Sequence, residues 1–361
     1  TLDLNNDKIY RTQEYITDTA LSEVAIKLHS PNIVLVAMYG GFNQIGRTGL
    51  LKVNAAINQA LVAIKPNSSI LDSEFLQYNL NYRVDYWKSV ASSSRKDPNI
   101  TSNDVKAYVL AFPNVKEQQK IANSLSDTDT LISELEKLIE KKQAIKTATM
   151  QQLLTGKTRL PEFALREDGM PKAYKESELG QIPEDWEVDK IGNTLSITTG
   201  SRNTEDKVND GTYPFFVRSQ NVERINTYSF DGEGVLTAGD GVGTGKIFHY
   251  INGKCDIHQR VYLMSNFKQT LDGYYFYIFF SNYFYDRIMS MTAKSSVDSV
   301  RREMIADMLI FLPSINEQKK IASVIKNLFE EIEVLNIKLN KLLEIKQGMM
   351  QELLTGKTRL V

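Results

Sequence analysis

The feature that most constrains this chain of 361 residues is an internal repeat. Residues 153–160 return unchanged at 353–360, and residues 117–122 return with one change at 317–322. Both pairs are 200 residues apart, and 21 of 49 positions are identical between residues 112–160 and 312–360. Two copies at so long a period exclude a solenoid of short repeats. The sequence therefore predicts a duplicated unit of about half the chain.

Each copy of the repeat predicts a long helix. Asn114 can cap its start, with Glu117 three residues further on, the arrangement of a capping box. Gly156 can end it in the left-handed conformation. About 40 residues at ~1.5 Å per residue make each helix roughly 60 Å long. The second copy has Ser314, Glu317 and Gly356 at the same places.

Apolar residues recur at spacings of three and four along both helices, in a heptad-like stripe between Glu and Lys residues. Such a stripe can lie on the helix's own domain. Two long helices of nearly equal length, each with one stripe, more simply pack against each other in antiparallel directions. The predicted seam comprises Ile132, Leu135, Ile139, Ile332, Leu335, Leu339 and Leu342, and Ile145, Leu153, Ile345, Met349 and Leu353 extend it.

The segments before the two helices predict globules of mixed α/β structure. Short β-type runs are separated by turns rich in Gly, Asn and Asp, and two stretches have helical character. The predicted fold class is α+β: two mixed α/β domains separated by two long antiparallel coiled-coil-like helices, with pseudo-twofold symmetry. The β-type runs are 33–38, 60–64, 235–236 and 261–264, and the helical stretches lie around 72–90 and 271–291.

The domain boundaries follow from the repeat. A lead-in sequence at 182–186, Ile-Pro-Glu-Asp-Trp, opens the second globule, and its counterpart would lie before residue 1. We therefore expect the first globule to lack its N-terminal segment. The predicted divisions are a first domain at 1–112, a first spacer helix at 113–159, a linker at 160–180, a second domain at 181–312 and a second spacer helix at 313–361.

Composition excludes several classes of protein. The chain is 24% charged and 42% hydrophobic, which excludes a disordered chain. One cysteine excludes a disulfide scaffold, and the longest apolar runs are too short to span a membrane. Lys and Arg number 43 against 44 Asp and Glu, so any binding to nucleic acid depends on local patches rather than on net charge.

The sequence predicts no catalytic residue and no metal site. Gly-Lys-Thr at 156–158 and at 356–358 lacks the earlier glycine of a phosphate loop. Phe-Asp-Gly-Glu-Gly at 230–234 is similar to the glycine turn of methyltransferases, but the chain has no Pro-Pro pair, so we expect a turn in the globule. His249, Cys255 and His258 are too few for a structural zinc site.

Loops rich in basic and amide side chains remain as candidates for binding DNA. Arg suits the edges of guanine, Asn and Gln suit adenine, and Lys and Ser suit phosphates. Each loop alone is more commonly a solvated surface loop, but their matching positions in both globules favour one working face. The candidates are Asn43, Gln44, Arg47, Ser94, Arg95, Lys96, Arg202, Asn203, Arg218, Gln220, Asn221, Lys246, Lys294, Arg301 and Arg302.

The chain resembles the specificity subunit of type I restriction–modification systems. The resemblance rests on residues 313–322 and their copy, on the Leu-Leu-Thr-Gly-Lys-Thr-Arg-Leu sequence that ends each helix, on the lead-in at 182–186 and on the Gly-rich turn at 239–246. It covers essentially the whole chain, and the order, spacing and duplication of the motifs all agree.

The resemblance implies two target-recognition domains, each of which reads one half of an asymmetric bipartite site in double-stranded DNA. It implies that helices 114–156 and 314–356 set the spacing and dock two copies of a DNA methyltransferase (M) subunit, which methylates adenine with S-adenosylmethionine. A restriction (R) subunit that uses ATP and Mg would join them. The chain itself would bind no cofactor and no membrane, would lack catalytic activity and would act in the cytoplasm.

Two other interpretations of the sequence stay open. One is a coiled-coil adaptor that carries two ligand-binding globules and does not bind DNA. The other is a fused methyltransferase, which the missing Pro-Pro pair argues against.

Overall fold

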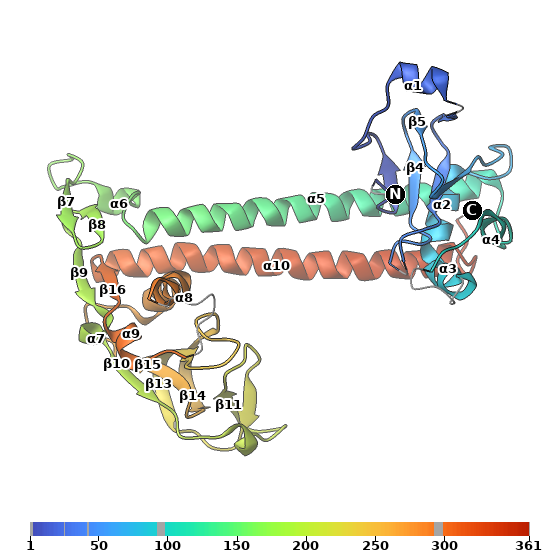
Figure 1. Ribbon diagram of the computed structural model, residues 1–361. Helices are drawn as coiled ribbons and strands as arrows, with labels where there is room; N and C mark the ends of the chain where they lie inside the picture. Colours follow the sequence, from blue (N-terminus) through green and yellow to red (C-terminus); the bar gives the residue numbers. More distant parts are fainter. Residues whose placement is uncertain (1–2, 25, 42, 92–97, 292–298, 361) are drawn as a thin grey trace. The chain divides into compact units, whose positions relative to one another are not determined.

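The computed structural model describes residues 3–24, 26–41, 43–91, 98–291 and 299–360 (Figure 1). The chain forms two compact units: unit 1 is Thr1–Ile139 with Val334–Val361, and unit 2 is Glu140–Glu333. Two long helices, α5 (Val115–Leu153) and α10 (Ile315–Leu353), contribute to both units. Each unit therefore contains one globule and opposite ends of the two helices.

The globule of unit 1 is built on a four-stranded sheet in the order β1-β4-β3-β6. Helices α2 and α3 cover the sheet, with Val34, Val36, Leu50, Leu76 and Trp87 in the shared core. Its elements are β1 (Asp7–Ile9), α1 (Asp18–Glu23), β2 (Leu28–His29), β3 (Val34–Ala37), β4 (Thr48–Leu51), β5 (Ala55–Ala56), β6 (Leu61–Ile64), α2 (Ser73–Tyr82), α3 (Val84–Val90) and α4 (Ser102–Lys106).

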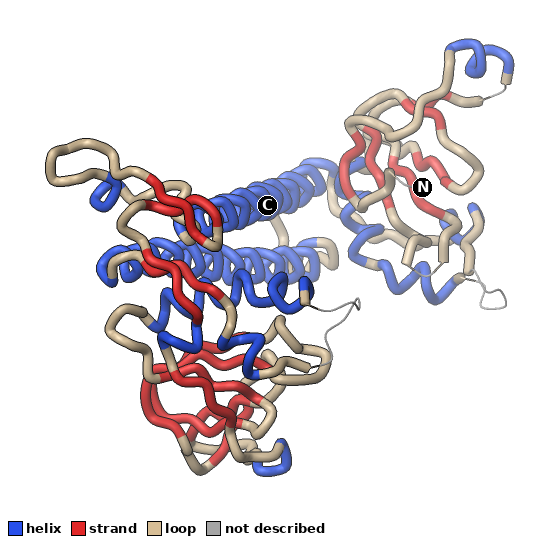
Figure 2. Tube along the Cα trace, turned by 60° about the vertical axis from the view of Figure 1, so that its left-hand side comes forward, coloured by secondary structure: helices blue, strands red, loops and turns tan. Residues whose placement is uncertain are grey.

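The globule of unit 2 is built on a six-stranded sheet in the order β10-β15-β13-β14-β11-β12, whose strands are red in Figure 2. All neighbours in it are antiparallel except β11 and β14. Helix α8 (Gly273–Ser290) packs Phe276, Phe280 and Phe284 against Val235 and Met264 of the sheet. The strands are β10 (Ser196–Thr199), β11 (Tyr213–Phe216), β12 (Glu223–Ile225), β13 (Phe230–Ala238), β14 (Phe248–Ile257) and β15 (Val261–Ser265).

Short elements complete unit 2. Strand β9 (Glu187–Lys190) pairs with β16 (Leu309–Leu312), and β7 (Tyr174–Ser177) pairs with β8 (Gly180–Pro183). The remaining elements are α6 (Pro161–Ala164), α7 (Ile191–Thr194), the 3-10 helix η1 (Thr204–Asp206) and α9 (Arg302–Ala306). None of the helices among the described residues has the length and apolar character needed to cross a membrane.

The turn predicted at 230–234 is wrong, because these residues form the first half of β13. Gly232 has φ +151° and lies opposite Gly253 of β14, so two glycines face each other across the ladder. The ring of Phe230 lies over the space above Gly232. Gly232 therefore leaves space beside the ring of Phe230, two residues earlier on the same strand, and does not form a turn.

The two long helices are antiparallel in each unit, as predicted. In unit 1, Ile121 and Leu125 near the start of α5 share a core cluster with Leu353 near the end of α10. In unit 2, Met150 and Leu153 near the end of α5 share a cluster with Ile321 near the start of α10.

The seam of the helices follows a strict alternation of three and four residues. The predicted seam residues Ile132, Ile139 and Ile332 are buried, and Leu135, Leu335, Leu339 and Leu342 are partly buried. Ile145 and Ile345 are exposed, so their prediction as seam residues is wrong. After Ile139 the alternation continues to Lys142 and then to Lys146. Lys142 Nζ lies 2.7 Å from Glu331 Oε1. Lys146 Nζ lies 4.7 Å from the ring centroid of Phe329.

The ends of the long helices follow the predicted capping only in part. Asn114 Oδ1 accepts the backbone N–H of Glu117 at 3.0 Å, and Ser314 Oγ accepts that of Glu317 at 3.3 Å. Gly156 and Gly356 are left-handed, with φ of +70° and +73°. The glutamate carboxylates, however, do not complete a capping box, because each binds the arginine of the closing sequence instead: Glu117 binds Arg359, and Glu317 binds Arg159.

Candidate nucleic-acid interface

A buried glutamine attaches each globule to a long helix in the same way. Gln118 Oε1 accepts the backbone N–H of Asp72 at 2.8 Å, and its Nε2 donates to the carbonyls of Ile70 and Pro113 at 2.9 and 2.8 Å. Asp72 is the N-cap of α2. The same three bonds join Gln318 to Asp272, Thr270 and Pro313 at 2.9, 2.8 and 2.8 Å. The repeated glutamine thus fixes how each globule meets its helix.

Four loops of unit 2 that the sequence singled out meet at one end of its sheet. The backbone N–H of Arg202 donates to Ile257 O at 3.2 Å, which joins the loop at 200–203 to the end of β14. Gly239 N donates to Arg260 O at 2.8 Å, and Val300 N donates to Gly239 O at 2.7 Å. These bonds bring the loops at 239–246 and 299–302 beside the turn at 258–260.

An acidic side chain organises two arginines in the middle of this loop cluster. Asp240 Oδ1 accepts from Arg218 Nη1 and its Oδ2 accepts from Arg260 Nη1, both at 2.7 Å. Partial burial raises the pKa of Asp240, but the bonds from the two arginines outweigh it and hold the pKa below its ordinary value. Each bond uses one of the five N–H donors of a guanidinium. The pair is thereby oriented with donors left over for a ligand.

Arg260 and Asp240 were missed at the sequence level. In the repeat, residues 258–260 correspond to residues 58–60, and Gln259 matches Gln59. Arg260, however, corresponds to Ala60. This change from alanine to arginine at a related turn is the sequence signal that could have identified Arg260. Asp240 lies inside the Gly-rich run at 239–246, where nothing in the local sequence points to its two arginine partners.

Arg202 is bound within the domain. Its Nε donates to the buried Asp256 at 3.1 Å, and its Nη2 donates to Thr227 at 3.1 Å. Asp256 also accepts from Thr227 and Ser229 at 2.6 and 2.7 Å. Arg202 is thus part of a network that ties the loop at 200–203 to β14. Its neighbour Asn203 accepts from Gln259 Nε2 through Oδ1.

The other candidates of unit 2 line the exposed side of the loops. Lys246 Nζ lies 5.2 Å from the ring centroid of Tyr285, and Arg301 stands at the N-cap of α9. The exposed candidates are Gln220, Asn221, Lys246, Arg301 and Arg302. Lys294 lies outside the described residues, as do Ser94, Arg95 and Lys96 of unit 1.

Unit 1 has the same loop framework with different side chains. Met38 N donates to Ala60 O at 2.8 Å, and Ile100 N donates to Met38 O at 3.0 Å, which corresponds to the bonds of Gly239 and Val300 in unit 2. Arg47 Nε donates to the carbonyl of Asn43 at 2.9 Å. The candidates Asn43, Gln44 and Arg47 are all exposed on the loop between β3 and β4.

Among the residues that the structure describes, no group of three or more His, Cys, Asp or Glu side chains is placed to hold a metal ion. Burial raises the pKa of the Cys255 thiol to about 12. Burial also lowers the pKa of His258, whose Nδ1 accepts the backbone N–H of Arg260 at 3.0 Å.

Comparison with known proteins agrees with the duplication. The family model for the type I restriction modification DNA specificity domain matches residues 3–147 and again residues 183–344. The type I restriction enzyme MjaVIII specificity subunit of Methanocaldococcus jannaschii is 26% identical, over 97% of this chain and 86% of its own length. The EcoDI specificity subunit of Escherichia coli is 29% identical, over 49% of this chain and 38% of its own.

A solved structure shares the fold. The crystal structure of the type I restriction–modification system S subunit from M. genitalium aligns with a TM-score of 0.64 at 17% identity. The alignment covers 91% of this chain and 84% of that one.

Proposed function

The chain belongs to the family of type I restriction–modification DNA specificity subunits, and we propose that each of its globules reads one half of an asymmetric bipartite DNA site. As a specificity subunit, it is a non-catalytic component that recognises a DNA target. The two matches of the family model and the two related loop clusters support the recognition of two separate half-sites.

The observation that carries this proposal is the loop cluster of unit 2. Arg218 and Arg260 are held side by side by one carboxylate, in the middle of loops that supply further Arg, Lys, Asn and Gln side chains. A bidentate arginine is the commonest specific contact to guanine in the major groove. The exposed Lys246, Arg301 and Arg302 around the pair suit phosphate contacts, which position a protein without reading sequence.

Differences between the two clusters support an asymmetric site. Ala60 of unit 1 stands where unit 2 has Arg260, and the two clusters share backbone bonds rather than side chains. Two different surfaces on one framework read two different sequences.

The long helices are the proposed docking site for two M subunits. The seam residues face the partner helix, so a protein partner would contact the outer faces. Leu131, Leu138 and Ile145 are exposed and recur every seven residues, which places them in one row on α5. The M subunits would bring S-adenosylmethionine, and R subunits would bring ATP and Mg. The assembly would act in the cytoplasm.

Selection from random duplex DNA tests the proposal. The purified chain, with and without an M subunit encoded beside it, is incubated with the library, and bound DNA is sequenced. We expect two unlike half-sites at a fixed gap, with stronger enrichment when the M subunit is present. Absence of any enriched sequence in both samples would favour the adaptor interpretation, and methyl transfer by the chain alone would contradict a non-catalytic role.

A further inference from the structure

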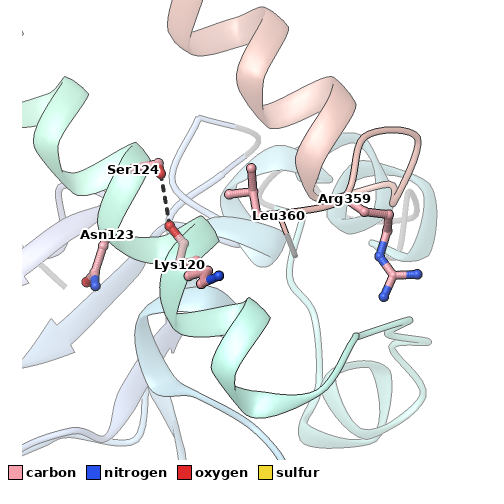
Figure 3. A pocket seen from close by; sticks show the side chains of 5 residues that line it. All are labelled: Lys120, Asn123, Ser124, Arg359 and Leu360. Carbon is pink, nitrogen blue, oxygen red and sulfur yellow. Dashed lines mark hydrogen bonds between the residues drawn. The ribbon is translucent and has the colours of Figure 1, made fainter.

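Arg359 shows how this chain holds an arginine at both its side chain and its backbone. Its Nε and Nη2 donate to the carboxylate of Glu117 at 2.7 Å, and the backbone N–H of the next residue, Leu360, donates to the same carboxylate at 3.2 Å. Arg359 and Leu360 line a cavity of about 580 Å³ together with Lys120, Asn123 and Ser124 of α5 (Figure 3). An arginine that reads a base needs the same two constraints, because its guanidinium must present a fixed fork of donors.

Arg260 is also held at its side chain and its backbone, but by two different residues. Its Nη1 donates to Asp240 Oδ2 at 2.7 Å, and its backbone N–H donates to His258 Nδ1 at 3.0 Å. His258 is 4% exposed, whereas the side chain of Arg260 is 60% exposed. The buried imidazole therefore fixes the backbone from which an exposed guanidinium extends.

The bond from Arg260 requires a neutral imidazole. A backbone N–H only donates, so Nδ1 of His258 must carry a lone pair, whereas a protonated ring has an N–H on both nitrogens and cannot accept. Burial is the main cause that lowers the pKa of His258, the charges of Arg218 and Arg260 lower it further, and Asp240 raises it. The ring is therefore neutral at pH 7, and it gains a proton and loses the bond only below its ordinary pKa of about 6.5.

The charged groups on the neighbouring loop and strand keep their charge in this pH range. Arg202, on the loop beside the turn, donates to Asp256 at 3.1 Å, two residues before His258. Burial alone would raise the pKa of Asp240 and Asp256, but hydrogen bonds hold both below the ordinary value. Of these groups, only His258 changes its charge between pH 7.5 and pH 5.5.

Unit 1 makes the same bond with a side chain that does not titrate. Asn58 corresponds to His258 in the repeat, and its Oδ1 accepts the backbone N–H of Ala60 at 3.1 Å. Leu61 N donates to Asn58 O at 3.2 Å, just as Val261 N donates to His258 O at 3.0 Å. An amide and an imidazole thus hold equivalent turns, and only the imidazole responds to pH.

We propose that His258 is a positioning residue for base reading by unit 2, and that protonation of its ring releases Arg260 and relaxes the half-site of this unit alone. The proposal rests on the proposed function, in which Arg260 contacts a base. His249, beside the loop at 217–221, does not share this role. Its Nε2 lies 3.0 Å from Ser219 O, which only accepts, so a protonated His249 keeps its bond.

Selection from random duplex DNA at pH 7.5 and at pH 5.5 tests the role of His258. At the lower pH, the parent should lose about tenfold of its preference for one base of the unit 2 half-site, and the other half-site should stay the same. His258→Asn copies the amide of unit 1 and should keep the preference at both pH values, whereas His258→Ala should lack it at both. His249→Gln keeps a donor for Ser219 O and should respond to pH as the parent does.

Nuclear magnetic resonance gives a readout that needs no DNA. The backbone amide signal of Arg260 should shift as the pH falls below about 6.5 in the parent and should not do so in His258→Asn. Melting temperatures confirm that each variant is folded. An amide signal that does not titrate would overturn the inference, as would a selected site whose base preference is the same at both pH values. A parent that enriches no sequence at either pH is a different result, because it contradicts the proposed function itself.

Discussion

Arg159 and Glu317 form a two-point ion pair although 158 residues separate them. Arg159 Nε donates to Glu317 Oε1 at 2.8 Å, Nη2 donates to Oε2, and the carboxylate is 1% exposed. Burial lowers the pKa of Arg159, but its bonds to Glu317 and Asp185 outweigh this and hold the pKa above its ordinary value. The pair ties the end of α5 to the start of α10 in unit 2.

Removing Glu317 should destabilise unit 2 strongly. Glu317→Ala leaves the guanidinium of Arg159 and the indole N–H of Trp186 without their shared acceptor in a buried place. Breaking a buried ion pair from one side costs about 3–5 kcal/mol of unfolding free energy. Urea unfolding followed by circular dichroism measures the loss. Glu317→Gln, which keeps one acceptor oxygen, should lose less.

The control for this prediction is Glu333→Ala, since Glu333 is exposed on the same helix. It should unfold as the parent does. Equal midpoints for Glu317→Ala and Glu333→Ala would mean that the ion pair does not stabilise the unit.

The duplication and local periodicity were enough to predict most of the architecture. The gapless offset of 200 identifies two equivalent helices, and glycines at 156 and 356 mark their ends. Periodicity failed at Ile145, because an apolar residue six positions after Ile139 does not lie on the same face of a helix. The local pattern also predicted that the Glu117 side chain completes a capping box. It binds Arg359 instead, and that residue is 242 positions away in the sequence.

The candidate site was less predictable than the fold, because its contacts join residues that are far apart in the sequence. The loops at 217–221 and 239–246 could be named from composition, but the contact between Arg218 and Asp240 depends on how β13 and its neighbours fold. Arg202 stays a predicted DNA-binding residue, but the bond from its guanidinium to Asp256, 54 residues further on, could not be predicted from the local sequence. Which arginine faces outward is decided by such long-range acceptors.

The stability of unit 2 should fall in acid through Asp256. Burial alone would raise the pKa of this carboxyl group, but bonds from Thr227, Ser229, the backbone N–H of Ile257 and Arg202 hold it below its ordinary value. An unfolded Asp has a pKa of about 3.9, so the ionised group stabilises the fold above that pH. The contribution is lost as the pH falls from about 4 through the lower folded pKa.

Melting temperatures from pH 7 to pH 2.5 check this prediction. Asp256→Asn should melt at a lower temperature than the parent at pH 7, and this difference in melting temperature should shrink as the pH approaches 2.5. Asp231→Asn, at an exposed position on β13, is the control and should run parallel to the parent. If the difference in melting temperature between Asp256→Asn and the parent is the same at every pH, the ionised carboxylate is not the cause of the loss of stability in acid.

If the helices set the distance between half-sites, lengthening both should lengthen the preferred gap. One heptad inserted after Ile139 and another after Val334 should keep the seam in register. Lys142 of α5 pairs with Glu331 of α10, and each insertion point lies three residues from one member of that pair. Seven residues add ~10.5 Å of helix, which corresponds to about three base pairs. Selection from a duplex library with variable gaps measures the change, and both half-site sequences should stay the same.

A heptad inserted into α5 alone is the comparison for the ruler prediction. It disturbs the pairing of the two helices and should lower the melting temperature without defining a new gap. An unchanged gap in the doubly lengthened chain would show that the helices do not set the spacing.

The arginine pair of unit 2 should determine one half-site. Arg218→Ala or Arg260→Ala should each cost about 1–3 kcal/mol of binding to the selected site and relax the preference at one position of one half-site. Asp240→Asn keeps both arginines but removes the carboxylate that orients them. It should reduce specificity while it strengthens salt-sensitive binding to random DNA, because it adds net positive charge to the face.

Lys207→Ala is the control for loss of charge, because Lys207 pairs with Glu223 away from Asp240. It should leave the preferred bases unchanged. Arg301→Ala and Arg302→Ala separate the two kinds of contact: a phosphate contact weakens all sequences alike and flattens the salt dependence, whereas a base contact changes one position. Affinity, base preference and salt dependence measured on the selected duplex decide between them. If all four arginine variants match the parent in these three quantities, this end of the sheet does not face DNA.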